Sequence, residues 1–119
     1  MINRNPSIKV YLALGNTDMR KSFNGLAALV QECFKLEIFS ESIFVFCNKN
    51  RNRIKLLQWD RNGFWLHYKR LEKGIFNWPE NIYEKETLEI SDRQLSWLLD
   101  GLEINQERAH KKVIIDKVV

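Results

Sequence analysis

Cysteine and histidine are scarce in this sequence, with two of each among its 119 residues. Cys33 and Cys47 lie among apolar neighbours and far from each other along the chain, which favours two buried free thiols over a disulfide framework or a zinc site. No stretch approaches the roughly 18–20 apolar residues that a membrane-spanning helix needs. The first residues, Met-Ile-Asn-Arg-Asn, lack the basic-then-apolar order of a secretion signal. We therefore expect a cytoplasmic protein in a reducing environment, without membrane contact.

The motifs of several common enzyme classes are also missing. The chain contains no Gly-x-Gly-x-x-Gly run, no phosphate loop ending in Gly-Lys-Ser/Thr and no Gly-x-Ser-x-Gly elbow. A metal-dependent nuclease gathers several carboxylates around its ions, but Asp18, Asp60 and Asp92 are scattered, with no Glu or His at a ligand spacing. We therefore expect no catalytic residues, no metal and no cofactor. The rival interpretation, a DNA-processing enzyme, would depend on Asp18, Asp60 or Glu72.

The composition is that of one globular domain. A mass of 14.2 kDa, with 45% hydrophobic and 29% charged residues, allows a modest core and excludes two catalytic lobes. We expect a domain over residues 1–104. Residues 105–119 are expected to form a polar tail that is ill-ordered or ordered only by a partner.

Alternating apolar residues and turn signals predict the secondary structure. Apolar residues recur at helical spacing after Ser22, so a helix is expected from there to about Leu36. Ser91 and Gln94 have the spacing of a capping box before a second, short helix that ends at Gly101. The predicted strands are residues 8–14, 42–47, 53–59, 64–71, 75–78 and 87–90. The fold class is therefore α+β: an antiparallel β-meander sheet with an N-terminal strand and helix and a short C-terminal helix, the helices covering one face.

The charges are unevenly distributed along the chain. Residues 47–73 contain eight Lys or Arg against two acidic residues, whereas residues 80–107 contain eight Asp or Glu against two basic ones. A basic stretch of this kind is typical of a surface that meets a polyanion such as nucleic acid. The alternative is that the two stretches neutralise each other, within the fold or across a subunit contact.

Strand alternation predicts where the basic side chains of the central stretch lie. Arg51, Arg53 and Lys55 share one side of their strand, and we expect Trp65 and Lys69 of the next strand beside them. Such a face suits nucleic acid, because phosphates bind Lys and Arg while exposed bases stack on aromatic rings. The alternative is an ordinary solvated sheet face whose aromatic residues belong to the core. The candidate nucleic-acid-binding residues are Arg51, Arg53, Lys55, Trp65, Lys69 and Arg70, with Arg20 and Lys21 at the start of the first helix as a second contact.

An ordered series of sequence blocks makes the chain recognisable. The first block is Leu14-Gly-Asn-Thr-Asp-Met-Arg-Lys-Ser-Phe-Asn-Gly-Leu-Ala-Ala-Leu-Val30. The later blocks are Ile43-Phe-Val-Phe46, Arg53-Ile-Lys-Leu-Leu with Trp59-Asp60 and Gly63, Tyr68-Lys-Arg-Leu-Glu72 with Gly74, Phe76, Trp78 and Pro79, and Leu99-Asp100-Gly101. Over about residues 7–103 the chain resembles the TnpB (Orf2-like) accessory proteins of insertion-sequence-66 transposons. Ser22 departs from the family, which usually has glycine there.

The resemblance implies a part in bacterial DNA transposition beside a separate, larger transposase that cuts the DNA. Together with the basic residues, it predicts a non-enzymatic accessory protein that binds transposon DNA within a transposition complex. The alternative is a protein-interaction adaptor that binds the transposase, or another protein of the element, without contacting DNA. A homo-oligomer is a further expectation, in which the basic stretch of one copy meets the acidic stretch of another.

Overall fold

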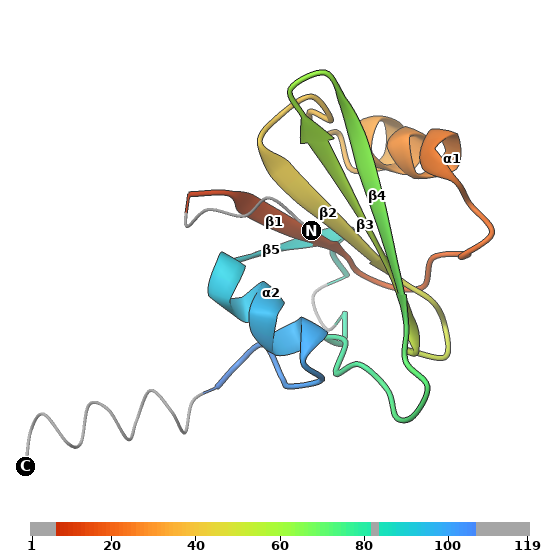
Figure 1. Cartoon of the computed structure of the whole chain (residues 1–119), viewed down its shortest axis with the longest axis vertical. Coiled ribbons are helices and arrows are strands. Elements are labelled where there is room, and N and C mark those ends of the chain that lie inside the picture. Colours follow the sequence, from red (N-terminus) through yellow and green to blue (C-terminus); the bar gives the residue numbers. More distant parts are fainter. Residues whose placement is uncertain (1–6, 82–83, 107–119) are drawn as a thin grey trace, which may run out of the picture.

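The computed structural model describes residues 7–81 and 84–106, so most of the expected tail at 105–119 lies outside the described residues. A five-stranded sheet forms the centre of the fold, and its strands lie in the order β4-β3-β2-β1-β5 (Figure 1). The strands are β1 (Lys9–Ala13), β2 (Ser42–Cys47), β3 (Arg53–Asp60), β4 (Gly63–Arg70) and β5 (Thr87–Ile90). The helical elements are α1 (Phe23–Ala28), the π-helical segment η1 (Leu29–Cys33) and α2 (Asp92–Leu99).

The predicted α+β class and the meander are confirmed. β2, β3 and β4 pair antiparallel in sequence order, and β1 pairs parallel with β2 and antiparallel with β5. The parallel pair arises because the chain crosses over through α1 and η1 between β1 and β2. The first strand of the chain therefore lies inside the sheet.

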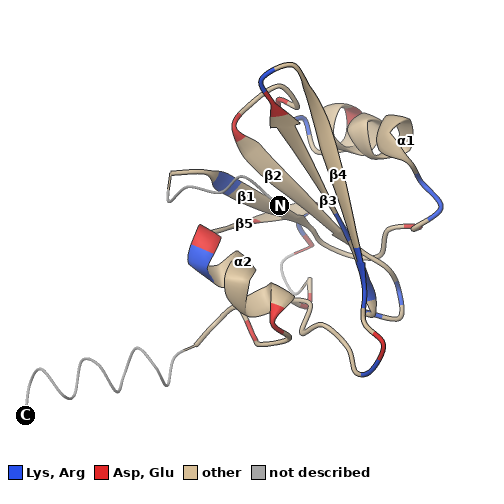
Figure 2. Cartoon of the chain, viewed as in Figure 1, with Lys and Arg blue, Asp and Glu red and all other residues tan. Residues whose placement is uncertain are grey.

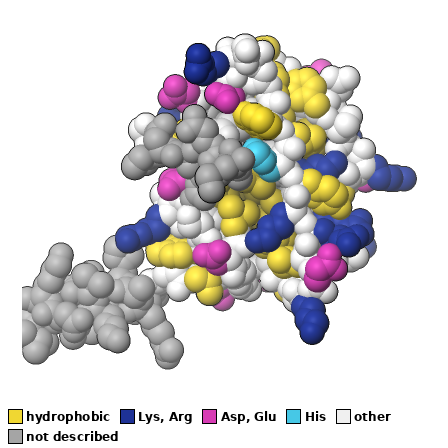
Figure 3. Space-filling model, viewed as in Figure 1, with side chains coloured by type: hydrophobic (Ala, Val, Ile, Leu, Met, Phe, Trp, Pro, Cys, Tyr) yellow, Lys and Arg dark blue, Asp and Glu magenta, His cyan; other side chains and the backbone are white. Residues whose placement is uncertain are grey.

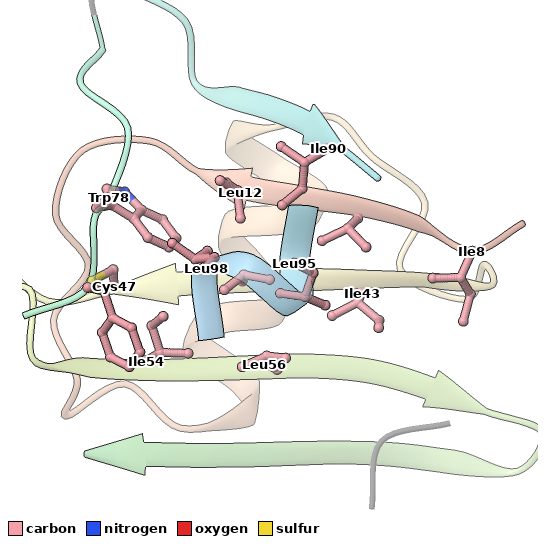
Figure 4. Close-up of a cluster of buried hydrophobic side chains, with 13 residues drawn as sticks. Ile8, Leu12, Ile43, Cys47, Ile54, Leu56, Trp78, Ile90, Leu95 and Leu98 are labelled. Atoms are coloured by element: carbon pink, nitrogen blue, oxygen red, sulfur yellow. The ribbon is translucent and has the colours of Figure 1, made fainter. Parts of the chain in front are cut away.

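The two helices cover opposite faces of the sheet, so the prediction that they share one face is wrong. Along β2, Ile43, Val45 and Cys47 join the core that Leu95 and Leu98 of α2 complete (Figure 4). The intervening Phe44 and Phe46 join a second core with Leu26 of α1 and Val30 of η1. All six residues of β2 are buried, and all except Ser42 are apolar. A strand covered on both faces reads as a continuous apolar run rather than an alternating one.

Three local predictions differ from the structure. Residues 75–78 form no strand: the backbone N–H of Phe76 donates to the carbonyl of Arg51 at 2.7 Å, and Phe76 and Trp78 are buried in the core under α2. The first helix ends at Cys33, and Lys35 has a positive φ of 57°, which a helix does not continue through. Cys47 is buried as expected, but Cys33 is exposed.

The second helix begins at the predicted capping box. The Ser91 hydroxyl accepts the Gln94 backbone N–H at 3.1 Å, and the Gln94 side-chain oxygen accepts the Ser91 N–H at 2.9 Å. These reciprocal bonds satisfy two backbone donors at the start of α2. Among the described residues no helix is long and apolar enough to span a bilayer.

Candidate nucleic-acid interface

The pairing of β3 with β4 decides which basic side chains share a face. Arg53 lies opposite Arg70, and Lys55 lies opposite Tyr68. Directly opposed residues of an antiparallel pair point to the same side, so these four side chains lie on the α1 side of the sheet. Arg70, expected in the interface, is therefore a cross-strand neighbour of Arg53.

Trp65 and Lys69 lie on the opposite, α2 side, so the expectation that they stand beside Arg53 and Lys55 is wrong. Lys69 lies opposite Ile54, which is buried in the α2-side core. The sequence contained the signal for the correct register. A two-residue loop at Arg61-Asn62 pairs Asp60 with Gly63, and counting back from that pair makes Tyr68, not Trp65, the aromatic neighbour of Lys55.

An open hollow of about 550 Å³ lies over this part of the α1-side face. It is bounded by the loop between β1 and α1, by the β2–β3 turn, and by Arg53 and Tyr68 of the hairpin. Its lining residues are Asn16, Thr17, Asp18, Met19, Arg20, Asn48, Lys49, Asn50, Arg53 and Tyr68. Figure 2 shows basic residues on the three segments that meet here, and in Figure 3 Lys and Arg side chains gather at the right of the view, with hydrophobic side chains between them.

Lys55 holds the loop between β1 and α1 against the sheet. Its ammonium donates to the backbone carbonyls of Met19 at 2.7 Å and of Lys21 at 2.8 Å. It also lies over the ring of Tyr68, 5.5 Å from the ring centroid, where the ring's negative face attracts a cation. Lys55 therefore shapes the hollow, and two protein carbonyls already occupy two of its three donors.

Asp18 and Arg20 form an ion pair at the rim of the hollow. The Arg20 guanidinium approaches Asp18 at 2.7 Å, and the Arg20 backbone N–H donates to the same carboxylate at 2.9 Å. Hydrogen bonds from the Arg20 side chain and backbone N–H lower the pKa of Asp18 to about 2, and the Asp18 carboxylate raises the pKa of Arg20. The Arg20 side chain is nevertheless 92% exposed, so most of it remains open to solvent.

The remaining cations in or next to the hollow differ in whether their side chains already have protein partners. Lys21, Lys49 and Arg53 are exposed, and within residues 7–81 and 84–106 their side chains have no hydrogen bond or ion pair. Arg70 contacts Glu72 at 3.0 Å, and this carboxylate raises the pKa of Arg70. Both side chains of this pair are exposed, so the pair contributes only about 0–1 kcal/mol to stability. Another anion can therefore compete for Arg70.

Arg51 is part of the scaffold rather than of the exposed surface. It lies in the β2–β3 turn with a φ of 60°. Its guanidinium donates to the carbonyls of Gly15 at 2.9 Å and Asn48 at 3.3 Å, and it lies 5.9 Å from the ring centroid of Trp78. These contacts tie the β1–α1 loop to the β2–β3 turn, which form two walls of the hollow.

On the α2 side, Trp65 and Lys69 form hydrogen bonds with other parts of the protein. The Lys69 ammonium donates to the carbonyl of Leu99, at the end of α2, at 2.9 Å. The Trp65 indole donates to Asp60 at 2.9 Å, and its ring stacks on that of His67 with centroids 5.9 Å apart. Burial lowers the pKa of His67. Both candidates therefore support the hairpin and α2 from the face away from the hollow.

The carboxylates considered for a metal site lie apart. Asp18 pairs with Arg20, and Asp60 accepts from Trp65. Over the described part of the chain no three His, Cys, Asp or Glu residues gather in a way that could hold a metal ion.

A comparison with known families covers the part of the chain that forms the sheet and the hollow. The family of IS66 Orf2 like proteins matches residues 8–109. The chain belongs to this family.

Among its relatives is the uncharacterized protein y4hO of Sinorhizobium fredii (strain NBRC 101917 / NGR234). It is 38% identical over 103 residues, which cover 87% of this chain and 88% of the relative. The uncharacterized protein y4jC of the same strain is 32% identical over 103 residues, covering 87% and 86% of the two chains. No solved structure matches. Membership of the IS66 Orf2-like family makes this chain a transposition-associated accessory protein.

The charged stretches of this IS66 Orf2-like protein are segregated by its topology. The basic hairpin strand β4 forms one edge of the sheet, and β5, in the acidic stretch, forms the other. No ion pair joins the basic residues 47–73 to the acidic residues 80–106 in the part of these stretches that the structure describes. The two stretches therefore do not neutralise each other by direct contact within one copy there.

Proposed function

We propose that this accessory protein binds nucleic acid in the transposition complex through a basic face composed of Arg20, Lys21, Lys49, Arg53 and Arg70. The observation that supports the proposal is that Arg20, Lys49 and Arg53 line one hollow. Lys21 follows Arg20 in the chain, and Arg70 lies opposite Arg53 across the hairpin. Arg51 and Lys55 support this face as scaffold, while Trp65 and Lys69 lie behind it.

The chemistry of the basic face fits phosphates rather than a small acidic ligand. Exposed Lys and Arg side chains gain from neutralising phosphates and releasing condensed counterions. Lys21, Lys49 and Arg53 have no side-chain partner among the described residues, and the pairs of Arg20 and Arg70 are solvent-exposed. The cations surround an open surface instead of a closed pocket, as a chain-like polyanion requires. Contacts of this kind position a protein on nucleic acid without reading its sequence. In this role the protein assembles the complex, and the separate transposase performs the chemistry.

The test is the salt dependence of binding to a 20-base-pair duplex, measured by fluorescence anisotropy with the full chain. Arg53→Ala should weaken binding and lower the slope of log K against log salt by roughly 0.9, the value of one lost phosphate contact. Lys49→Ala together with Arg53→Ala should lower it by about twice that amount.

Lys69→Ala is the matched control. It removes the same charge from the same hairpin, but on the opposite side of the sheet. Its slope should equal that of the unsubstituted protein once circular dichroism shows an intact fold. Equal slopes for Arg53→Ala and the unsubstituted protein, or equal losses for Arg53→Ala and Lys69→Ala, would remove the basic face from the mechanism.

The segregated charges favour a second candidate, an adaptor that binds the transposase. Glu84, Glu86 and Glu89 are exposed on and before β5, at the sheet edge away from the basic face. Such a surface suits a basic protein partner. Co-purification with the transposase after nuclease treatment, lost on charge reversal of these three glutamates and accompanied by no DNA binding, would establish this function instead.

A further inference from the structure

We infer that the hollow takes an unpaired nucleotide, whose base stacks on Tyr68, so that the protein prefers single-stranded over duplex nucleic acid. This inference rests on the proposed function and specifies its ligand. It starts from Tyr68, an aromatic residue that lines the hollow while 55% of its surface remains exposed.

Tyr68 is an aromatic ring among cations. Lys55 lies opposite it, Arg70 follows two positions along the same strand face, and Arg53 is its diagonal neighbour. The Lys55 ammonium lies over the ring and is itself held by two backbone carbonyls. The ring is therefore held within the charged surface instead of being buried in the core, which is the combination that single-strand-binding surfaces use.

Polar groups suited to a base edge line the same hollow. Asn16 and Asn50 are exposed, and their side-chain amides have no partner within the described ranges. Each amide carries donors and an acceptor, as the edges of bases do. Asn48 is different, because its side chain is already bonded to the turn around Asn52 and Arg53. The side-chain amides of Asn16 and Asn50 thus line the same hollow as the Tyr68 ring.

The dimensions and charges agree with one nucleotide. A volume of about 550 Å³ lies within the roughly 300–1,000 Å³ of small-molecule sites. Lys49 and Arg53 at the wall can meet the phosphates on either side of the nucleotide. In a duplex the faces of the bases are stacked on each other, so only an unpaired base can offer a face to Tyr68.

The experiment compares the full chain with Tyr68→Ala on a fluorescent 20-nucleotide oligothymidine and on a duplex of equal length. Tyr68→Ala should weaken oligothymidine binding about tenfold, since one stacked base contributes roughly 1–3 kcal/mol, and should change duplex binding by less than twofold. Tyr68→Phe keeps the ring and should bind as the unsubstituted protein does. Trp65→Ala is the matched control, because Trp65 is 50% exposed on the same strand but on the other side of the sheet.

Two further probes separate the outcomes. An abasic strand should bind with the same strength to the unsubstituted protein and to Tyr68→Ala, because no base is present to stack. Oligouridine distinguishes an RNA strand from a DNA strand as the source of the nucleotide. Duplex binding that depends on Arg53 while Tyr68→Ala leaves oligothymidine binding unchanged would overturn this inference and leave the proposed function standing. Binding of neither oligonucleotide by the unsubstituted protein would overturn both.

Discussion

Arg51 and Arg53 lie two positions apart and have different surroundings. The Arg51 guanidinium donates to two carbonyls and lies near the ring of Trp78, whereas Arg53 is exposed beside the hollow. The difference comes from the backbone: Arg51 lies in the turn with a positive φ, and Arg53 begins β3. The two arginines therefore have different roles: Arg51 supports the fold, and Arg53 belongs to the exposed surface.

At the residue scale, Arg51→Ala should lower the free energy of unfolding by about 1–3 kcal/mol, because hydrogen bonds from a charged donor to part-buried carbonyls are lost. Urea unfolding followed by tryptophan fluorescence measures the effect. Arg53→Ala, in an exposed position, should change stability by no more than about 0.5 kcal/mol. Equal stability of Arg51→Ala and Arg53→Ala would contradict the structural role of Arg51.

At the scale of elements, α2 is fixed at both ends by side chains. The capping box of Ser91 and Gln94 begins it, and Lys69 of β4 donates to the carbonyl of Leu99 at its end. Between these ends, Leu95 and Leu98 are buried against the sheet. Because the helix is only eight residues long, its own hydrogen bonds contribute little and the caps and the packing must hold it.

Ser91→Ala should therefore destabilise the protein by about 1 kcal/mol, the ordinary cost of losing an N-cap hydroxyl. Thermal unfolding monitored by circular dichroism measures it. Ser91→Asp keeps an oxygen acceptor at the N-cap and should retain most of the stability, so a loss as large as that of Ser91→Ala would show that the cap does not stabilise α2.

The elements that sequence reasoning predicted correctly are those with local signals. The apolar run of β2, the turn at Asp60–Gly63 and the spacing of Ser91 and Gln94 each identify a structure within a few residues. By contrast, the side of the sheet that each helix covers depends on pairing between strands that are distant in the sequence. Residues 75–78 have a strand-like composition but pack Phe76 and Trp78 into the core instead of pairing, which shows tertiary burial overriding local preference.

At the scale of the whole molecule, the sequence predicted that the candidate site is positively charged but not which segments form it. The basic composition of residues 47–73 indicated a polyanion-binding surface, yet the hollow also needs the β1–α1 loop, which only the pairing of β1 with β2 brings near. Lys49 and Tyr68 were missed for the same reason. Alternation assigns residues to faces within one strand, whereas the register between strands decides which residues become neighbours.

The layered arrangement predicts how stability is distributed. β2 is buried along its whole length and lies between β1 and β3, whereas β4 and β5 are edge strands. Amide hydrogens of β2 should therefore exchange slowest, at rates set by global unfolding, and those of β4 and β5 should exchange faster through local opening. Native-state hydrogen exchange measures this order, and edge strands as protected as β2 would contradict it.

The inner position of β1 has a consequence for biosynthesis. β1 leaves the ribosome before the other four described strands, but one of its two neighbours, β5, begins only at Thr87. A nascent chain that stops before this point lacks both β5 and α2, so it exposes an unpaired strand edge and the apolar sheet face that α2 covers. Such edges invite pairing with other chains. Products that stop before Thr87 should therefore aggregate, whereas a chain that extends through α2 pairs β1 on both sides and covers this sheet face.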